Sequence, residues 1–537
     1  MEHSHPTHKN YTELIWSIEE GQIQIPQFQR DFIWTMEDSA ELLDSVVKGY
    51  PIGTFIFWKT KERLRSVKQL GGIKLRSPKK GEEVNIVLDG QQRLTSLFAA
   101  LKGLKVTRHS KKEKEDFSGI CINLKADKDQ RIVTTKVNNL PPKTFISLAE
   151  LLRGDFTTLG GFSKEYHEKM KEYKRRVETY DFSVIEVFGF SIDLAANVFT
   201  RINVGARTLT VFEIMVARTY DEKLKFDLSE EYKKLNDKLE QIDYPIPKQT
   251  VLRLTAQILK NDSKRQAILK IGKNEFIKTW PKTVDSIEQA VAYFRGVIGI
   301  PVSQLLPYLD LLVLFAYFFY KHPKKPKQTQ MKELENLFWR CSLGGRYDAA
   351  IDSRLTQDIR RVNEILKNKK PNYEWEINFS ADRLIEDAEF NPNSSFIKAI
   401  LCIMISQPPL SFRNNGTVRV SKPWLSRSNG KNYHCFFPKK FLKGIGVDDS
   451  HANSVVNITI VEDDLEKEKI GTKPPSEYIR EYMKKFEAGN SKFAKTMRTH
   501  LIEDLKKFGV LDDDYNTFTR KRAEVIRKEI KKRIIDR

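Results

Sequence analysis

A chain of 537 residues exceeds one ordinary domain, so roughly two to four compact units are expected. The net charge of +21 favours polyanionic partners, above all nucleic acid, although a lysine-rich surface that only keeps the protein soluble would carry the same charge. The four cysteines are scattered and form no Cys-x-x-Cys pair. That usage is typical of reduced thiols in a cytoplasmic protein and argues against disulfide staples and zinc ligands.

The start of the chain, residues 1–10, is polar and includes His3, His5 and His8. No apolar signal region follows it, so we expect no secretion. We expect the three histidines to belong to a frayed end and not to a metal site.

Residues 25–34 place Gln29 and Arg30 among aromatic side chains, directly before an amphipathic pattern. That pattern predicts a helix over residues 36–48, capped by Thr35 or Asp38. A turn that contains glycine and proline, residues 49–53, then leads into a predicted strand over residues 54–58.

The most informative turn follows the apolar run of residues 84–88, which predicts a buried strand. The turn consists of Asp89, Gly90, Gln91, Gln92 and Arg93, here called the Asp89–Arg93 loop, and a helix is predicted over residues 94–101. Glycine lets a ligand approach the backbone, a helix N-terminus favours anions, and arginine can grip a phosphate bidentately. The loop is therefore predicted to handle phosphate; a polar turn without a ligand is the alternative.

Two charged segments, residues 59–80 and 111–115, predict exposed loops. Residues 181–187 predict a further strand of the same sheet. The segment 199–209, which contains Arg201 and Asn203, precedes a predicted helix over residues 211–220.

From there to about residue 400 the apolar residues recur at helical spacing. The apolar run 305–320 is shorter than the ~20 residues that a membrane span needs, so it predicts a buried core helix. Leu334, Leu337 and Phe338 fall on one helical face. Arg340 and Arg346 are expected to hold a surface between domains, with contact to a ligand as the alternative.

Turn signals after residue 400 mark a boundary. Residues 432–437 predict a strand that ends at Pro438, and residues 453–459 lead into a charged helical run. The end of the chain, residues 520–537, predicts a basic helix with three apolar side chains on one face: Ala523, Ile526 and Ile530. Such a helix would dock by that face and offer the other to phosphates, or it would simply be solvated.

Four segments resemble, in their order, the N-terminal domain of GmrSD-type restriction endonucleases, a ParB/sulfiredoxin-like family. They are the Pro-x-Phe-Gln-Arg segment that ends at Arg30, the Tyr-Pro-Ile-Gly turn that ends at Gly53, the Asp89–Arg93 loop, and the Phe-x-Arg-Ile-Asn element that ends at Asn203. Ordered motifs spread over this length are more specific than any one of them alone.

A second resemblance lies beyond residue 430, to the HNH-like nuclease domain of many relatives. It places His434 at a metal-ligand position and Asn457 at the central asparagine. Cys435 stands where a general-base histidine is expected, and Glu466 stands near the expected last ligand. A cysteine is a poor base here because its unperturbed pKa is about 8.5. Glu466 could still bind magnesium, and His434 is the alternative base.

The fold class implied is a helix-rich α+β protein in four parts. These are a ParB/sulfiredoxin-like domain at residues 1–220, a helical domain at 221–400, an HNH-like (ββα) domain at 401–490, and basic C-terminal helices at 491–537.

The function implied is antiphage defence by a cytoplasmic, modification-dependent DNA endonuclease. The resemblance implies that a nucleoside triphosphate binds the Asp89–Arg93 loop and that magnesium or manganese binds His434 and Glu466. The implied catalytic residues are His434, Asn457, Cys435 and Asp89, and the implied DNA-binding residues are Gln29, Arg30, Arg201 and Asn203. The expected partners are modified DNA and a second copy of the chain or companion defence proteins, with no membrane.

Two alternatives stay open from the sequence. One is a DNA-binding sensor or partner regulator with a degenerate nuclease domain, for which Cys435 is the best argument. The other is a nucleotide hydrolase that signals to a separate effector.

Overall fold

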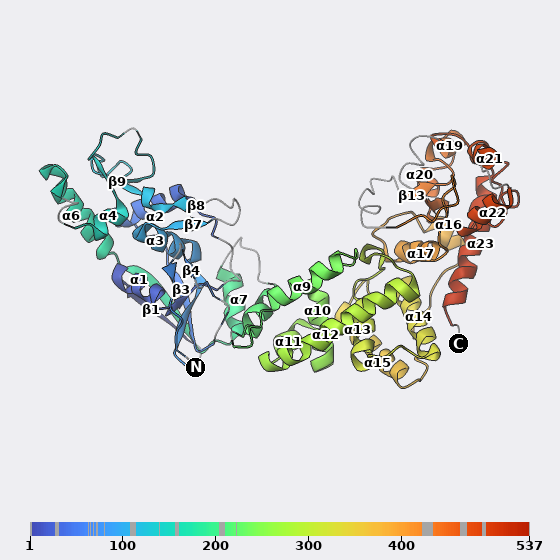
Figure 1. The fold of residues 1–537 in the computed structure, drawn as a ribbon, viewed down its shortest axis with the longest axis horizontal. Coiled ribbons are helices and arrows are strands. Elements are labelled where there is room, and N and C mark those ends of the chain that lie inside the picture. The colour runs from blue at the N-terminus through green and yellow to red at the C-terminus, as the bar shows by residue number, and fades with distance from the viewer. Residues whose placement is uncertain are drawn as a thin grey trace. The chain divides into compact units, whose positions relative to one another are not determined.

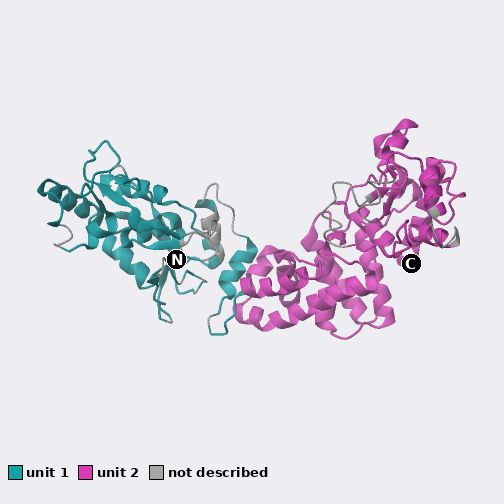
Figure 2. Cartoon of the chain, turned by 45° about the horizontal axis from the view of Figure 1, so that its top comes forward, with its two compact units in different colours: residues 1–228 teal, residues 229–537 magenta. Residues whose placement is uncertain are grey.

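The computed structural model describes residues 3–26, 32–62, 64, 66–67, 69–70, 73–79, 81–107, 114–138, 140–155, 160–202, 210–221, 223–420, 433–461, 470–485 and 490–535. The chain forms two compact units, Met1–Leu228 and Ser229–Arg537 (Figure 2). The fold is α+β with helices predominating, as predicted. The first unit ends close to the boundary expected at residue 220, while the boundaries at residues 400 and 490 stay predictions.

The first unit is built on a five-stranded sheet in the order β1-β12-β3-β6-β2. Two of its strands, β1 and β3, are labelled in Figure 1. The strands are β1 (His3–Lys9), β2 (Ile23–Gln24), β3 (Phe55–Thr60), β6 (Val84–Asp89) and β12 (Phe182–Phe188). β3 pairs with β12 in parallel and with β6 antiparallel. The predicted strands at residues 54–58, 84–88 and 181–187 are therefore confirmed as members of one sheet.

The N-terminal segment is an edge strand of this sheet, and the prediction of a frayed end was wrong. β1 pairs with β12 along its whole length, from His3 opposite Phe188 to Lys9 opposite Phe182. The ring of His3 also stacks on Phe188, with centroids 4.8 Å apart. Backbone pairing needs no apolar side chains, and polar side chains are well placed at a solvated edge. Side-chain composition alone therefore missed this strand.

Helices cover the sheet, and their ends follow the local sequence closely. α2 (Met36–Lys48) begins at Thr35, whose side chain accepts from the Asp38 backbone while Asp38 reaches back to Thr35. Both candidate caps thus act together in one capping box. Ala40, Leu43 and Val47 of α2 are fully buried in the core, next to α3 (Gln91–Lys102).

The other elements of this unit are α1 (Tyr11–Glu19), β4 (Gln69–Leu70), β5 (Ile73–Lys74), β7 (Lys105–Thr107), β8 (Lys114–Asp116), η1 (Phe117–Gly119), β9 (Cys121–Asn123), β10 (Val133–Thr134), β11 (Phe145–Ser147), α4 (Leu148–Arg153), α6 (Lys164–Glu178), α7 (Ile192–Ile202) and α8 (Val211–Thr219). The two charged segments predicted as loops contribute short strands, because β4 pairs with β5 and β7 pairs with β8.

The second unit begins with helices, as the spacing predicts. They are α9 (Leu228–Glu240), α10 (Lys248–Lys260), α11 (Arg265–Leu269), α12 (Lys273–Tyr293), η2 (Phe294–Ile298), η3 (Ser303–Leu305), α13 (Leu311–Lys321), α14 (Gln328–Leu343), α15 (Ile351–Leu366), α16 (Ala381–Glu386) and α17 (Ser395–Ile405). α13 is the predicted core helix, although it begins only at Leu311, after the η3 turn. Within the described residues no helix is long and apolar enough to cross a membrane.

The C-terminal part of this unit contains one small hairpin and several helices. They are β13 (Tyr433–Cys435), α19 (Lys439–Gly444), α20 (Asp449–Ala452), η4 (Val455–Asn457), β14 (Ile458–Ile460), α21 (Pro475–Lys485), α22 (Asn490–Thr499) and α23 (Tyr515–Arg533). α23 packs on α14, α16, α17 and η4. Its three apolar positions are fully buried, which confirms the predicted docking face: Ala523, Ile526 and Ile530.

The two arginines of the helical part hold the protein together. Nη2 of Arg340 donates to the Ile535 carbonyl at 2.9 Å, which ties α14 to the end of the chain. Nε of Arg346 pairs with Asp358 at 3.1 Å. The contact of Arg340 fits the expected role at a surface between domains, whereas the ion pair of Arg346 lies within the helical part.

Candidate functional site

The Asp89–Arg93 loop joins the end of β6 to the start of α3. Gly90 adopts a left-handed conformation with φ of 93°. A Cβ atom at this position would lie 2.5 Å from Cδ1 of Phe55, so the loop requires a glycine here. No side chain caps α3 at Gly90. The N-terminus of α3, with its partial positive charge, is therefore the part of the loop best suited to an anion.

Arg93 is held by the protein itself. Nη1 donates to the Ile52 carbonyl at 2.8 Å, and Nη2 donates to the Thr54 carbonyl at 3.1 Å. Nη2 also pairs with Oδ2 of Asp89 at 2.9 Å, and the guanidinium lies 5.2 Å from the centroid of the Phe55 ring. Arg93 thus fastens the Tyr-Pro-Ile-Gly turn to the loop. The predicted direct grip of Arg93 on a phosphate stays a prediction.

Gln92 connects the loop to a further motif. Its Oε1 accepts from the Ile33 backbone N–H at 3.0 Å, just after the Pro-x-Phe-Gln-Arg segment. Gln29 and Arg30 themselves lie outside the described residues. On the other side, α7 packs against β6 and carries Arg201, exposed in its last turn. Asn203 lies outside the described residues.

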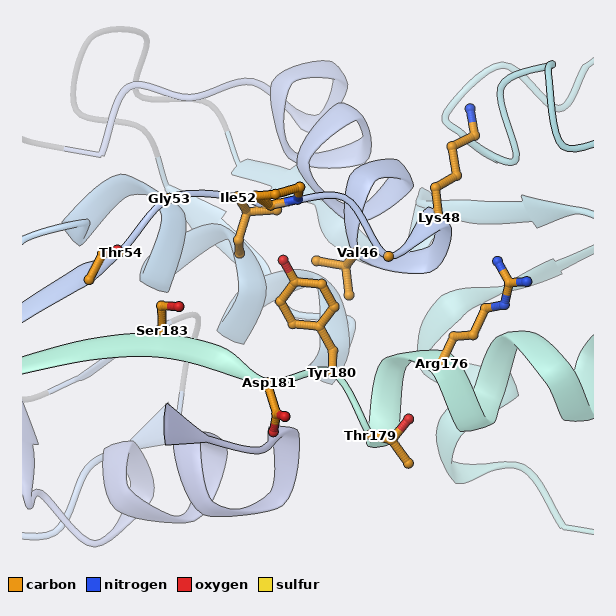
Figure 3. Close-up of a pocket in the computed structure, with 12 residues that line it drawn as sticks. Val46, Lys48, Ile52, Gly53, Thr54, Arg176, Thr179, Tyr180, Asp181 and Ser183 are labelled. Atoms are coloured by element: carbon orange, nitrogen blue, oxygen red, sulfur yellow. The ribbon is translucent and has the colours of Figure 1, made fainter. Parts of the chain in front are cut away.

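A pocket of about 580 Å³ opens beside the Tyr-Pro-Ile-Gly turn (Figure 3). Ile52 and Thr54, whose carbonyls Arg93 holds, form part of its wall. The Tyr180 hydroxyl donates to the Tyr50 carbonyl at 2.7 Å, and Nη1 of Arg176 donates to the Val47 carbonyl at 3.0 Å. Sequence reasoning missed these two lining residues because they belong to no recognisable motif; only the structure brings them to the turn.

The C-terminal hairpin buries His434. The side chain is 1% exposed, and its ring lies in edge contact with Phe412 and Tyr478. Burial, with a smaller contribution from His500, lowers the pKa of His434 to about 3, so the ring is neutral. The Thr459 hydroxyl donates to the His434 carbonyl at 3.2 Å. The Nδ1 atom of the His434 ring lies 3.1 Å from the oxygen of that hydroxyl. The other ring nitrogen, Nε2, has no hydrogen-bond partner among the described residues.

Asn457 is fully buried and bonded to the backbone on every side. Its Oδ1 accepts from the Phe437 N–H at 2.8 Å, and its Nδ2 donates to the Phe437 and Ala452 carbonyls at 2.9 and 3.0 Å. These contacts hold together the two ends of the segment that connects β13 to β14. The neighbouring Cys435 is buried and forms no disulfide bond with another described residue.

Comparison with known proteins identifies the first unit. Residues 11–220 match the family described as GmrSD restriction endonuclease, N-terminal domain. The first unit is therefore similar to the N-terminal domain of this family, here called the GmrSD domain. The chain is also similar to an uncharacterized protein of Methanocaldococcus jannaschii, with 26% identity over 534 residues that cover 90% of this chain and 88% of the relative. That similarity extends far beyond the GmrSD domain into the second unit.

The metal site that the HNH resemblance implies at His434 and Glu466 stays a prediction. No group of three His, Cys, Asp or Glu side chains among the residues that the structure describes is close enough to hold an ion. Glu466, the second predicted ligand, lies outside the described residues. Of the two predicted ligands, His434 is the one that the structure describes, and its Nε2 atom is buried.

Proposed function

We propose that this protein is an antiphage restriction endonuclease whose GmrSD domain senses modified DNA and controls cleavage by the region around the β13–β14 hairpin. The observation that supports this best is the position of the Asp89–Arg93 loop among the other motifs. Arg93 bonds to the Tyr-Pro-Ile-Gly turn and Gln92 bonds to Ile33. Separate motifs that meet at one loop favour a shared ligand site over several unrelated turns.

Within this proposal the loop binds a nucleoside triphosphate by its backbone. Gly90 lets the loop pack tightly on Phe55, and the partial positive charge at the start of α3 favours a phosphate. Asp89 keeps one carboxylate oxygen on Arg93 and orients water or a cation with the other. Arg93 is a positioning residue, because its donors hold the turn. Gln29, Arg30, Arg201 and Asn203 are the proposed contacts to DNA.

The proposed cleavage function belongs to His434 and its neighbours. Because His434 is 1% exposed, the aromatic cover over it must open before its ring can reach a phosphodiester. In this proposal Asn457 has a structural role and keeps the hairpin in shape, because each hydrogen bond of its side chain goes to the backbone. DNA bound at the GmrSD domain would promote this opening.

A DNA sensor that does not cut is the second candidate. The burial of His434 and the thiol at Cys435 favour it, because neither group can activate water in its present surroundings. Such a sensor would act through companion defence proteins or a second copy of the chain.

Restriction of phages with differently modified genomes tests the proposal in cells. We expect the wild-type chain to restrict at least one modified phage, and Asp89→Asn to abolish restriction. Asp129→Asn, at an exposed site in the same unit, is the matched control and should restrict like wild type. Equal restriction by both variants would exclude the loop from function.

Nicking of supercoiled plasmid by the purified chain, with magnesium or manganese, separates the two candidates. If the protein is an endonuclease, we expect the wild-type chain to nick the plasmid. We expect His434→Ala to remove this nicking activity while the variant remains folded. A sensor restricts in cells together with its partners, yet leaves every plasmid intact with either ion and with added nucleotide.

A further inference from the structure

The outward face of α23 carries a dense row of positive charge. Six exposed basic side chains, here called the basic stripe, lie on it: Arg520, Lys521, Arg527, Lys528, Lys531 and Lys532. At 100° per residue these positions fall on one side of the helix, opposite Ala523, Ile526 and Ile530. The two faces therefore separate cleanly into a buried apolar side and an exposed basic side.

Most of this charge is not neutralised within the protein. The two acidic residues of the helix are both engaged: Glu529 pairs with Lys532 and Arg533, and Glu524 pairs with Lys521. In the described part of the chain, no carboxylate lies within ion-pair distance of Arg520, Arg527, Lys528 or Lys531. A structural role in internal ion pairs does not explain these four cations.

The stripe is carried by a rigid support next to the candidate hairpin. Arg522, on the buried side, donates to the Val456 carbonyl at 2.6 Å and to the His500 carbonyl at 3.1 Å. The Phe518 ring stacks on Phe436 with centroids 5.0 Å apart. α23 is thus fixed to η4 and to the chain just after β13. A ligand on the stripe would lie at a set position relative to His434.

The shape and charge of this surface select its partner. The stripe spans about 18 Å, a length over which duplex DNA presents on the order of ten phosphate charges. An amphipathic helix at a membrane inserts its apolar face, and the apolar face of α23 is already buried in protein. A long polyanion fits the stripe, and a lipid surface does not.

We propose that the basic stripe of α23 binds the phosphate backbone of duplex DNA, independently of sequence, and holds it beside the β13–β14 hairpin. This inference deepens the proposed function and rests on DNA being the substrate. Contacts to phosphates give binding that weakens steeply with salt and does not depend on base sequence or modification. Modification would then be sensed by the GmrSD domain, and the stripe would supply general affinity.

Fluorescence anisotropy of the full chain with an unmodified duplex of about 30 base pairs tests the inference, in EDTA and over about 50 to 200 mM salt. The variant Arg527→Gln, Lys528→Gln, Lys531→Gln removes three charges and keeps good helix formers. The control Lys367→Gln, Lys369→Gln, Lys370→Gln removes three exposed charges elsewhere in the same unit. Circular dichroism and a thermal melt establish that both variants fold.

We expect the stripe variant to bind at least about tenfold more weakly at 100 mM salt, with a salt slope smaller by up to about three. The control should bind within about twofold of wild type. Equal effects of the two triple variants on duplex binding would overturn the inference, and so would unchanged duplex binding by the stripe variant. If the stripe behaves as expected but no modified phage is restricted, the proposed function alone fails.

Discussion

Gly53 and Arg93 fit together so closely that a Cβ atom on Gly53 would lie 2.5 Å from Nη1 of Arg93. Gly53 also has a φ of 85°, in the left-handed region. The glycine of the Tyr-Pro-Ile-Gly turn and the arginine of the Asp89–Arg93 loop are therefore one structural unit. Two motifs that look independent in the sequence depend on each other in the fold.

This contact predicts a measurable coupling. Gly53→Ala should destabilise the turn by about 2–3 kcal/mol, since it adds left-handed strain and displaces a guanidinium. Gly49→Ala is the control, because its φ is 77° but a Cβ atom there would meet no other atom within 4 Å. Native-state hydrogen exchange of peptides covering residues 49–56 reports the local free energy of opening.

The excess cost of Gly53→Ala over Gly49→Ala should vanish when Arg93 is replaced by alanine, because the clashing atom is then absent. An unchanged excess in that background would mean that the strain comes from the backbone alone.

Asn457 supports a second prediction, that its first role is structural. Asn457→Ala removes three hydrogen bonds and leaves the Phe437 N–H and two carbonyls buried, at a cost of about 3 kcal/mol. Asn457→Asp should cost at least as much, because a carboxylate cannot donate to those carbonyls. Asn516→Ala, at an exposed site in the same unit, should cost less than about 1 kcal/mol. Urea unfolding measures all three, and a fully stable Asn457→Ala chain that fails to nick DNA would instead make Asn457 catalytic.

Local sequence signals determined the positions of several elements well. The helix over residues 36–48 was predicted to the residue because Thr35 and Asp38 form a capping box and Gly49 ends the helix. The buried strand before Asp89 followed from its apolar run. Such signals involve only a few neighbouring residues, so they can be recognised in the sequence before the fold is known.

Long-range relationships could not be predicted in the same way. β1 exists because it finds an edge of the sheet beside β12, more than a hundred residues later in the chain. The partners of Arg93 depend on which carbonyls of the Tyr-Pro-Ile-Gly turn point toward it. Arg176 and Tyr180 reach the pocket only because α6 ends there. These contacts belong to the tertiary structure and leave no motif.

The buried histidines predict that acid destabilises the second unit. Burial lowers the pKa of His500 to about 4, although its hydrogen bond to the Leu410 carbonyl opposes the shift. The unfolded chain takes up protons near pH 6.5, while the folded chain resists until about pH 4. The contribution of such a histidine to the free energy of unfolding is therefore fully present above pH 6.5. It falls as the pH drops toward 4, by about 1.4 kcal/mol per pH unit for each histidine.

His434, with its pKa of about 3, adds to the same slope. We therefore expect the free energy of unfolding, measured with urea between pH 4 and pH 6.5, to depend less steeply on pH in His500→Gln than in wild type. At pH 8 the His500 ring is neutral in both the folded and the unfolded chain. A measurement at that pH therefore gives the cost of the lost side-chain packing alone. Parallel pH profiles for the two chains would show that His500 already takes up its proton in the folded state.

Asp358 provides the last prediction, on the core of the helical part. Its fully buried carboxylate pairs with Nε of Arg346 at 3.1 Å and with Nη1 of Arg361 at 2.7 Å, and it accepts from the Tyr347 hydroxyl at 2.7 Å. Asp358→Asn keeps the shape but leaves Arg346 without its carboxylate partner and Arg361 with only the exposed Glu374 carboxylate at 4.0 Å, so it should cost about 3 kcal/mol.

An exposed acidic residue of the same unit, Asp382, gives the control Asp382→Asn, with an expected change below about 0.5 kcal/mol. Thermal and urea unfolding of both variants measure the difference. If Asp358→Asn melted like wild type, the two arginines would be satisfied by the stacking of their guanidinium groups on Trp375, 4.3 and 4.9 Å from its ring centroid, and not by the carboxylate.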